Sequence, residues 1–234
     1  MTHFYYKVDN LLAIKQLPSI DETSASNEAL FTIIAKDIES QGYSIRPAAL
    51  PEELALSLLC YLQTVEAEKF KAAGIGRGDE YLENEFVRTD EICWITGETE
   101  VCKKWLDWSL GLQNFLNRRL FLGLFSFESH FSHYGPGDYY KRHCDAFKGE
   151  VNRILSVVVY FNKGWTSADG GELVLYKDDH DKDGIRVVPL LCKLVTFLSE
   201  EFPHEVLVAN RHRYAIAGWF RVNTSVTEKV DPPL

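Results

Sequence analysis

The first half of the chain carries apolar residues at the spacing of helices. Leu30, Ile34 and Ile38 recur at every fourth position, and Gly42 stands where such a helix would end. Residues 1–25 show little periodicity and predict a loosely packed arm, which ends in the capping-rich stretch DETSASNE. We therefore expect the first helix to follow this stretch and to stop at Gly42.

Two further helices are predicted. Pro51, followed by two glutamates, is typical of a helix start. The apolar stripe of this helix consists of Leu54, Leu58, Leu62 and Val65. A third helix is expected after Thr99, with a stripe made of Val101, Trp105, Trp108, Leu112 and Phe115. Stripes at this spacing are typical of faces packed on a core, so no chemistry is assigned to them.

From about residue 121 the pattern changes to short stretches rich in β-branched and aromatic residues. RILSVVVYFN, at Arg153–Asn162, predicts a buried strand. Further strands are predicted at Tyr43–Arg46, Ile92–Ile95, Phe121–His133, Gly171–Tyr176, Ile185–Val188, Leu194–Ser199, Glu205–Ala209 and Tyr214–Val222. Helices first and many short strands later predict an α+β, mainly β fold, with helices packed outside an antiparallel sandwich or barrel.

Composition narrows the function classes. The 234 residues suit one large domain, and 46% hydrophobic residues are enough to bury a core. The net charge of −9 argues against a nucleic-acid partner, and no apolar run is long enough to span a membrane. The N-terminus lacks the pattern of a signal peptide. The five scattered cysteines form no CxxC pair and fit reduced thiols, so we expect a cytoplasmic protein.

The segment Gly74–Asp90 has a different character. It begins with three closely spaced glycines and continues with mixed charges. The glycines lack the strand–turn–helix setting and the full spacing of a dinucleotide-binding loop. A flexible loop is therefore the better interpretation.

The candidate metal ligands are His143, Asp145 and His204. Residues two apart on an extended strand point the same way, so His143 and Asp145 can reach one ion, while His204 must come from another strand. Two imidazoles and one carboxylate are the set that holds non-haem Fe(II) on one face and leaves the other face open. A chance H-x-D pair remains the alternative for these two residues alone, and it is the residues downstream that favour a metal site.

Arg213 is a charge at an inward position. It shares a strand face with Ala215, Ala217 and Trp219, and that face is mostly apolar. A buried guanidinium needs an anionic partner, which is either an internal carboxylate or a carboxylate of a bound co-substrate such as 2-oxoglutarate. Tyr160 has the parity of an inward-facing residue and could add a phenol hydrogen bond, although many such tyrosines are ordinary core residues.

Five motifs, in their order and spacing, resemble the 2-oxoglutarate- and Fe(II)-dependent prolyl hydroxylases: SHYGPGDYYKRHCDAF, RILSVVVYFNKGW, DGGELVLY, FPHEV and RYAIAGWF. The similarity is greatest to the branch that hydroxylates hypoxia-inducible factor and to its bacterial relatives. It covers about residues 43–222 and implies a double-stranded β-helix (jelly-roll) core with packed N-terminal helices. We expect this dioxygenase domain to lie between an arm and first helix at 1–42 and a tail at 223–234.

The resemblance also implies roles for individual residues. Three side chains would bind Fe(II): His143, Asp145 and His204. Four would surround 2-oxoglutarate: Arg213 and Tyr160 at its distal carboxylate, Tyr134 near the metal, and Trp219 in the pocket wall. Two would lie near the peptide substrate: Arg153, and Arg77 in the Gly74–Asp90 loop that covers the substrate in this family. The turn YGPGD is one residue shorter than in the animal enzymes, a departure that bears on the position of Tyr134.

The implied activity is hydroxylation of a prolyl residue in a protein, with Fe(II), 2-oxoglutarate and dioxygen, and with ascorbate in support. The bacterial relatives imply elongation factor Tu as the protein substrate. One alternative keeps the chemistry and changes the target to another residue type, a free amino acid or an alkylated nucleobase. The net charge of −9 disfavours DNA. The other alternative is a catalytically inert barrel that binds a metal or a partner.

Overall fold

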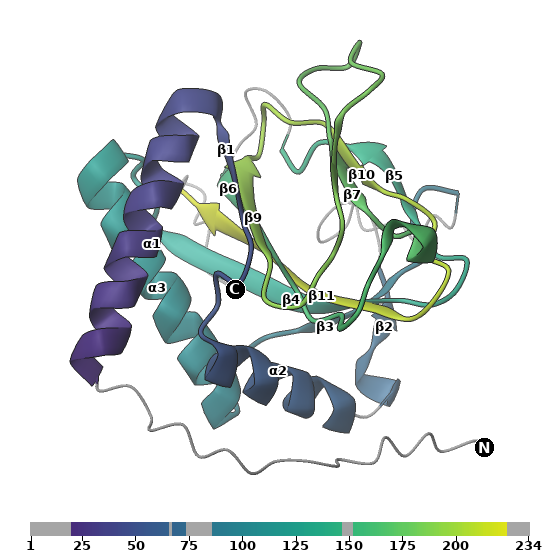
Figure 1. The fold of residues 1–234 in the computed structure, drawn as a ribbon, viewed down its shortest axis with the longest axis horizontal. Helices are drawn as coiled ribbons and strands as arrows, with labels where there is room; N and C mark the ends of the chain where they lie inside the picture. Colours follow the sequence, from purple (N-terminus) through teal and green to yellow (C-terminus); the bar gives the residue numbers. More distant parts are fainter. Residues whose placement is uncertain (1–19, 66, 74–85, 147–151, 224–234) are drawn as a thin grey trace, which may run out of the picture.

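The computed structural model describes residues 20–65, 67–73, 86–146 and 152–223. Figure 1 shows two facing sheets with helices along one flank. The helices are α1 (Ile20–Gln41), α2 (Glu52–Thr64) and α3 (Glu100–Leu120). The strands are β1 (Tyr43–Arg46), β2 (Lys71–Ala72), β3 (Glu91–Trp94), β4 (Ser126–Tyr134), β5 (Tyr140–His143), β6 (Arg153–Tyr160), β7 (Leu173–Leu175), β8 (Ile185–Val187), β9 (Leu194–Leu198), β10 (His204–Val206) and β11 (Arg213–Arg221).

The strands form two antiparallel sheets. The larger sheet has the order β1-β9-β6-β11-β4-β3-β2, and the smaller sheet has the order β5-β10-β7-β8. Neighbours in space are mostly not neighbours in sequence, because the chain passes back and forth between the two sheets. This is the jelly-roll sandwich, and the predicted α+β, mainly β fold is confirmed.

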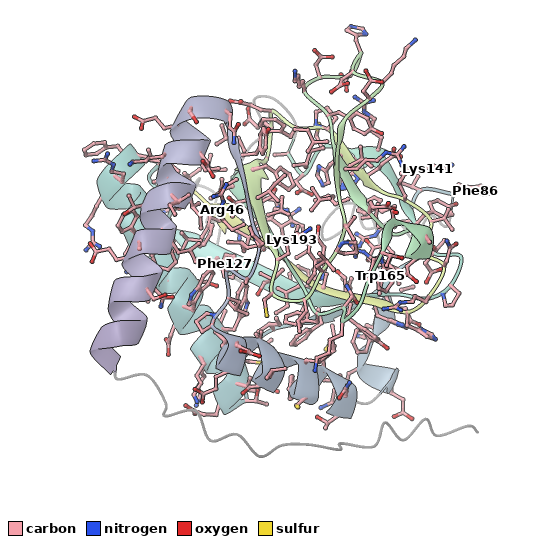
Figure 2. All side chains as sticks on the ribbon, in the orientation of Figure 1. Arg46, Phe86, Phe127, Lys141, Trp165 and Lys193 are labelled. Carbon is pink, nitrogen blue, oxygen red and sulfur yellow. The ribbon has the colours of Figure 1, made fainter. Side chains whose placement is uncertain are left out.

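Two apolar cores hold the layers together. One lies between the helices and the outer face of the larger sheet, and it includes Trp105 of α3 and Phe220 of β11. Phe127 of β4, labelled in Figure 2, packs against both of these rings, with centroid separations of 5.9 Å to Trp105 and 4.5 Å to Phe220. The other core lies between the two sheets and includes Tyr160 and Ala215. Strand β11 is therefore buried on both faces.

The second and third helices begin as predicted. Helix α2 begins after Pro51, and helix α3 has Thr99 as its N-cap, whose side chain accepts a hydrogen bond from the amide of Cys102. Helix α3 ends at Leu120, and its C-cap residue Phe121 adopts the left-handed conformation with φ of 56°. The predicted strands also form, each within a few residues of the expected limits.

The predicted start of the first helix is wrong. Helix α1 begins at Ile20, so the stretch DETSASNE lies inside it instead of before it. Ser, Thr and Asp cost little in a helix interior, and α1 gains stability because its buried face contacts α3 and β1. The remainder of the predicted arm, residues 1–19, and residues 224–234 of the predicted tail lie outside the described residues. The predicted division at residue 42 stays a prediction.

Three strand assignments also differ. The predicted strand at Glu205–Ala209 is β10, which begins one residue earlier, at His204, and ends at Val206. Strand β4 begins at Ser126, because residues 121–125 form the connection that follows α3. Short β5 was assumed to continue through the second candidate metal ligand, but it ends at His143. None of the described helices combines the length and the apolar character needed to cross a bilayer.

Candidate active site

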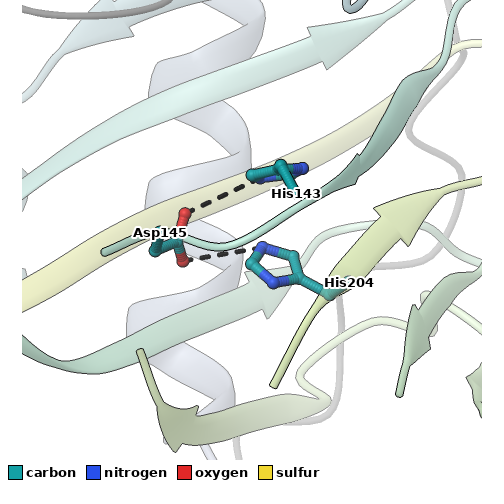
Figure 3. Close-up of side chains that lie close together, drawn as sticks. All are labelled: His143, Asp145 and His204. Carbon is teal, nitrogen blue, oxygen red and sulfur yellow. Dashed lines mark ion pairs between the residues drawn. The ribbon is translucent and has the colours of Figure 1, made fainter. Parts of the chain in front are cut away.

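The three candidate metal ligands come together at one end of the smaller sheet. His143 ends β5, His204 begins β10, and the two are paired across the strands. Asp145 follows β5 and turns its carboxylate toward both imidazoles, with Oδ1 at 3.7 Å from His143 Nε2 and Oδ2 at 3.5 Å from His204 Nε2 (Figure 3). The three donor atoms lie within 4.8 Å of one another, which is close enough to share one ion. Among the described residues no other such group of three occurs.

Backbone carbonyls orient both imidazoles. His143 Nδ1 lies 2.8 Å from the carbonyl of Lys141, and His204 Nδ1 lies 3.0 Å from the carbonyl of Phe202. A carbonyl only accepts, so each Nδ1 carries a hydrogen, and in the neutral tautomer this leaves the lone pair on Nε2. Burial lowers the pKa of His204 to about 4, although the charge of Asp145 opposes this shift. Both Nε2 atoms therefore present the donor that a divalent metal needs.

Asp145 is held from the opposite sheet. Ser156 of β6 donates a hydrogen bond of 2.6 Å from its hydroxyl to Asp145 Oδ2. Burial by itself would raise the pKa of Asp145, but the electrostatic interaction with His204 and the hydrogen bond and electrostatic interaction with His143 outweigh it and lower the pKa. The carboxylate is thus ionised at neutral pH. No role was predicted for Ser156, although its inward parity in RILSVVVY was the available signal.

Aromatic and charged side chains cover the outer side of His143. Tyr140 stacks on the imidazole with ring centroids 3.6 Å apart, and Arg88 lies over the Tyr140 ring at 4.3 Å. Arg88 is in turn paired with the buried carboxylate of Asp90 at 2.7 Å. None of these three residues was predicted from the sequence. Arg88 and Asp90 lie in the predicted Gly74–Asp90 loop, and Tyr140 lies three residues before His143.

The end of this predicted loop runs beside β5. The amide of Lys141 donates to the carbonyl of Val87 at 2.8 Å, and the amide of Thr89 donates to the carbonyl of Tyr139 at 3.2 Å. Phe86, 81% exposed, and Lys141 lie at the same edge of the molecule (Figure 2). Residues 74–85 of the loop, including Arg77, lie outside the described residues.

Arg213 is buried between the sheets, as its parity predicted. Its side chain is 2% exposed and donates from Nε to the carbonyl of Gly171 at 2.8 Å. No Asp or Glu within the described part of the chain forms an ion pair with it. The internal carboxylate that could have neutralised Arg213 is therefore absent from these residues.

Two tyrosines stand beside this guanidinium. Its Cζ lies 4.8 Å from the ring centroid of Tyr134 and 5.1 Å from that of Tyr160. Tyr160 Oη is buried and has no hydrogen-bond partner among the described residues, and burial raises the pKa of Tyr160 to about 12. A buried cation beside a protonated phenol that lacks an acceptor forms a site for a carboxylate. The shorter YGPGD turn does not displace Tyr134 from this group.

Gly171 makes room for Arg213. Its backbone has a φ of +64°, which favours glycine, and a Cβ there would lie 3.0 Å from Arg213 Cδ. The carbonyl of the same residue accepts the hydrogen bond from Arg213. The motif DGGELVLY thus supplies both the space for the guanidinium and one of its acceptors.

The remaining predicted residues lie further along the same face of the larger sheet. Trp219 stands opposite Ser156 and Glu128 on the neighbouring strands, and its indole Nε1 is buried without a partner among the described residues. The guanidinium of Arg153 lies 3.7 Å from the Trp219 ring centroid and donates to Glu128 at 2.8 Å. Glu128, a charge at an inward position of β4, was not among the predicted site residues.

The donor set fits a particular metal. Two neutral imidazoles and one carboxylate on a jelly-roll scaffold form the facial arrangement of non-haem Fe(II) oxygenases. Arg213 and Tyr160, which line the core between the same two sheets, fit the distal carboxylate of a dicarboxylic co-substrate. Fold and site together define the class of jelly-roll non-haem iron oxygenases.

Comparison with known proteins identifies the family. Residues 129–221 match the model of the 2OG-Fe(II) oxygenase superfamily. A prolyl-4-hydroxylase from Pseudomonas putida is 36% identical with a TM-score of 0.72, and the match covers 82% of this chain and 98% of that one. A prolyl hydroxylase from Trichoplax adhaerens, solved with a hypoxia inducible factor peptide fragment, is 25% identical with a TM-score of 0.72 and coverage of 85% and 92%. The chain belongs to the 2OG-Fe(II) oxygenase superfamily.

A curated relative matches over a shorter stretch. The hypoxia-inducible factor prolyl hydroxylase of Caenorhabditis elegans is 35% identical over 88 residues, which are 37% of this chain. The matched part spans only 12% of the length of that relative. The predicted resemblance to this family is confirmed.

Proposed function

We propose that this protein is a 2-oxoglutarate- and Fe(II)-dependent dioxygenase that hydroxylates a prolyl residue of a protein substrate, with elongation factor Tu as the first candidate. The observation that carries the proposal is that a cluster of three metal-binding side chains and a buried cation lie in the same protein interior. The His143–Asp145–His204 cluster offers three donors to one ion, and Arg213 is a buried cation with no carboxylate partner among the described residues. Either group alone would fit several functions.

Each residue has a defined task in this proposal. His143, Asp145 and His204 hold Fe(II), and the hydrogen bonds on both Nδ1 atoms keep each Nε2 directed at the metal. Arg213 and Tyr160 bind the distal carboxylate of 2-oxoglutarate. Tyr134 would contact the co-substrate on the metal side, and Trp219 would form part of the wall. Bound Fe(II) and 2-oxoglutarate supply the oxidising chemistry, in which one atom of O2 enters the substrate hydroxyl and the other enters succinate, with release of CO2.

Two observations support a protein as the substrate: the substrates named for the relatives, and the position of the Gly74–Asp90 loop. The Trichoplax protein was solved with a peptide bound, and the C. elegans relative is named for a protein substrate. The Gly74–Asp90 loop ends beside His143, where it could fold over a polypeptide, and Arg77 and Arg153 are candidate contacts to that chain. Elongation factor Tu is proposed because the motifs resemble those of bacterial relatives. We further propose that the protein is cytoplasmic and that it acts without a nucleic-acid or membrane partner. We also propose that ascorbate supports its turnover.

Mass spectrometry of purified elongation factor Tu tests the proposal. The factor is incubated with this protein, Fe(II), 2-oxoglutarate, ascorbate and air, and a peptide gain of one oxygen on a proline is expected. The same peptide should stay unmodified without 2-oxoglutarate and with the His143→Ala variant. An unmodified factor, with succinate still released, would exclude this substrate and favour another residue type or a small molecule.

The family is one of oxygenases, so a non-enzymatic metal-binding barrel is the least supported alternative. A metal-binding barrel predicts binding of Fe(II) without consumption of 2-oxoglutarate in the presence of a lysate of candidate substrates. Persistent absence of succinate under those conditions, with the metal bound, would reject the enzymatic proposal.

A further inference from the structure

A chain of two buried hydroxyls leads from the larger sheet to Asp145. Ser156 Oγ lies 2.6 Å from Asp145 Oδ2, and Ser199 Oγ lies 2.9 Å from Ser156 Oγ. Ser156 is 1% exposed and Ser199 is 0% exposed, so water does not compete for either hydroxyl. Ser156 belongs to β6, and Ser199 directly follows β9, its neighbour in the larger sheet.

The direction of each hydrogen bond follows from the groups involved. An ionised carboxylate only accepts, so the single hydroxyl proton of Ser156 must be given to Asp145. Ser156 Oγ can then only accept from Ser199, which makes Ser199 the outer donor. The amide of Ser199 donates to the carbonyl of Ile154 at 3.0 Å, and this bond holds the backbone of Ser199 against β6. Both hydroxyls therefore point their donors toward the metal cluster.

Asp145 needs such a constraint. It lies past the end of β5, so no ladder hydrogen bond of that strand holds its backbone. The terminal torsion of an aspartate is also broad, so packing alone does not set the plane of its carboxylate. The two imidazoles are each fixed by a carbonyl, whereas the carboxylate is fixed by Ser156.

We propose that Ser156, supported by Ser199, is a positioning residue that sets the orientation of the Asp145 carboxylate for metal binding. This inference rests on the proposed function, in which Asp145 is a ligand of Fe(II). Ser156 does not touch the metal; it acts through Asp145. Second partners of metal ligands typically change metal affinity by about 10- to 100-fold when they are removed.

Metal affinity measured without turnover tests the inference. Co(II) is titrated into the protein without 2-oxoglutarate, followed by calorimetry and by the visible spectrum of the bound ion. We expect Ser156→Ala to weaken Co(II) binding by about 10- to 100-fold and to alter the spectrum. Ser156→Thr, which restores a hydroxyl, should return both toward the wild-type values.

A matched control separates positioning from general loss of a buried hydroxyl. Ser44 donates to Asp37 Oδ2 at the same distance of 2.6 Å, and Ser44 lies on β1, the edge strand of the larger sheet that contacts helix α1. Ser44→Ala should therefore leave Co(II) affinity and spectrum unchanged. Wild-type affinity and spectrum in Ser156→Ala would overturn the inference, and so would an equal loss in Ser44→Ala.

A second variant keeps the test decisive if Ser156→Ala does not fold. Ser199→Ala keeps the inner hydroxyl and should weaken Co(II) binding by a few-fold. If Ser199 acts through Ser156, adding Ser199→Ala to the folded Ser156→Thr variant should cause a similar loss. Wild-type affinity in Ser199→Ala, where Ser156→Ala cannot be measured, would count against the inference.

Failure of the proposed function has a different signature. If wild-type protein and the His143→Ala variant bind Co(II) equally poorly, the metal site itself is rejected, and this inference falls with it. If wild-type protein binds Co(II) tightly, His143→Ala does not, and Ser156→Ala equals wild type, then the metal site stands and only the positioning role is rejected.

Discussion

Arg213 and Tyr134 stand directly opposite each other on the antiparallel strands β11 and β4. The guanidinium lies 4.8 Å from the tyrosine ring centroid, a distance at which a cation is attracted to the aromatic face. The ring therefore helps to hold a buried cation that no described carboxylate neutralises. The cation keeps its remaining donors for a ligand.

Arg213→Lys should weaken 2-oxoglutarate binding strongly. Lysine keeps the charge but loses the planar fork and the Nε hydrogen bond to Gly171. We expect a loss of roughly 1.5–3 kcal/mol, or about 10- to 150-fold in affinity. The measurement is calorimetric titration of 2-oxoglutarate into the Mn(II)-loaded protein without oxygen. Arg211→Lys, at an exposed neighbouring position, is the control, and equal affinity in both variants would refute the role of Arg213.

His143→Ala and Asp145→Ala should each abolish succinate formation and metal binding. Each variant removes one of three donors from the cluster, while the two apolar cores remain unchanged. The circular dichroism spectrum and the cooperativity of unfolding should therefore stay close to those of the metal-free wild type. Succinate release at the wild-type rate in either variant would show that the ligand assignment is wrong.

Stability should depend on the core between α3 and the larger sheet. Trp105 is fully buried, and its indole donates to Ser129 Oγ at 3.1 Å. Trp105→Ala should lower the free energy of unfolding by about 3–5 kcal/mol. Leu110→Ala on the same helix removes a side chain that is 50% exposed and should change it by less than about 0.5 kcal/mol. Urea denaturation of the three metal-free proteins gives the comparison.

Buried His130 should make the free energy of unfolding fall in mild acid. Burial, with the charge of Arg88, lowers the pKa of His130 to about 4, below its ordinary value of 6.5. Between these values the unfolded chain binds the proton and the folded protein does not, so this stability is complete above about pH 6.5 and is lost as the pH falls toward 4.

The difference between pH 7 and pH 5 is on the order of 2 kcal/mol for this one group. His130→Gln, which cannot titrate, should show a correspondingly smaller fall when urea denaturation of the metal-free proteins is compared at the two values. Equal pH dependence in wild type and variant would mean that His130 is protonated in the folded protein.

The loop that ends beside β5 should matter for the protein substrate more than for the cofactors. Replacement of residues 75–84 by glycine and serine at constant length, which removes Arg77, should reduce peptide hydroxylation. Binding of metal and 2-oxoglutarate should persist, because their proposed contacts lie elsewhere. Peptide hydroxylation is compared with 2-oxoglutarate affinity in the same preparation, and full hydroxylation would exclude a covering role for this segment.

Periodicity and motif order predicted most of the fold. The predicted helices form, and the antiparallel core was expected from the succession of short β-rich stretches. The start of α1 was missed because the residues of DETSASNE cap helices and also tolerate helix interiors, so tertiary contacts decide between the two. The limits of β10 were missed because pairing with β5 and β7, not local sequence, sets where that strand begins.

The sequence predicted those candidate site residues whose own position in a strand or motif is unusual. A charge at an inward position marked Arg213, and the spacing of the motif marked His143 and Asp145. Ser156 and Ser199 could not be paired from sequence, because their contact depends on the register between β6 and β9. The inward position of a single residue can be predicted from the alternation along its own strand. A contact between residues of two strands can be found only once the register of the folded sheet is known.

The division of the site between the sheets has a consequence for folding. His143 and His204 come from the smaller sheet, while Arg213 and Tyr160 come from the larger one. A co-substrate that contacts both the metal and Arg213 would clamp the two sheets together across their shared core. Such a ligand binds the folded sandwich and not the unfolded chain, so a higher ligand concentration would raise the free energy of unfolding. The cell's supply of 2-oxoglutarate would therefore also stabilise the protein against unfolding.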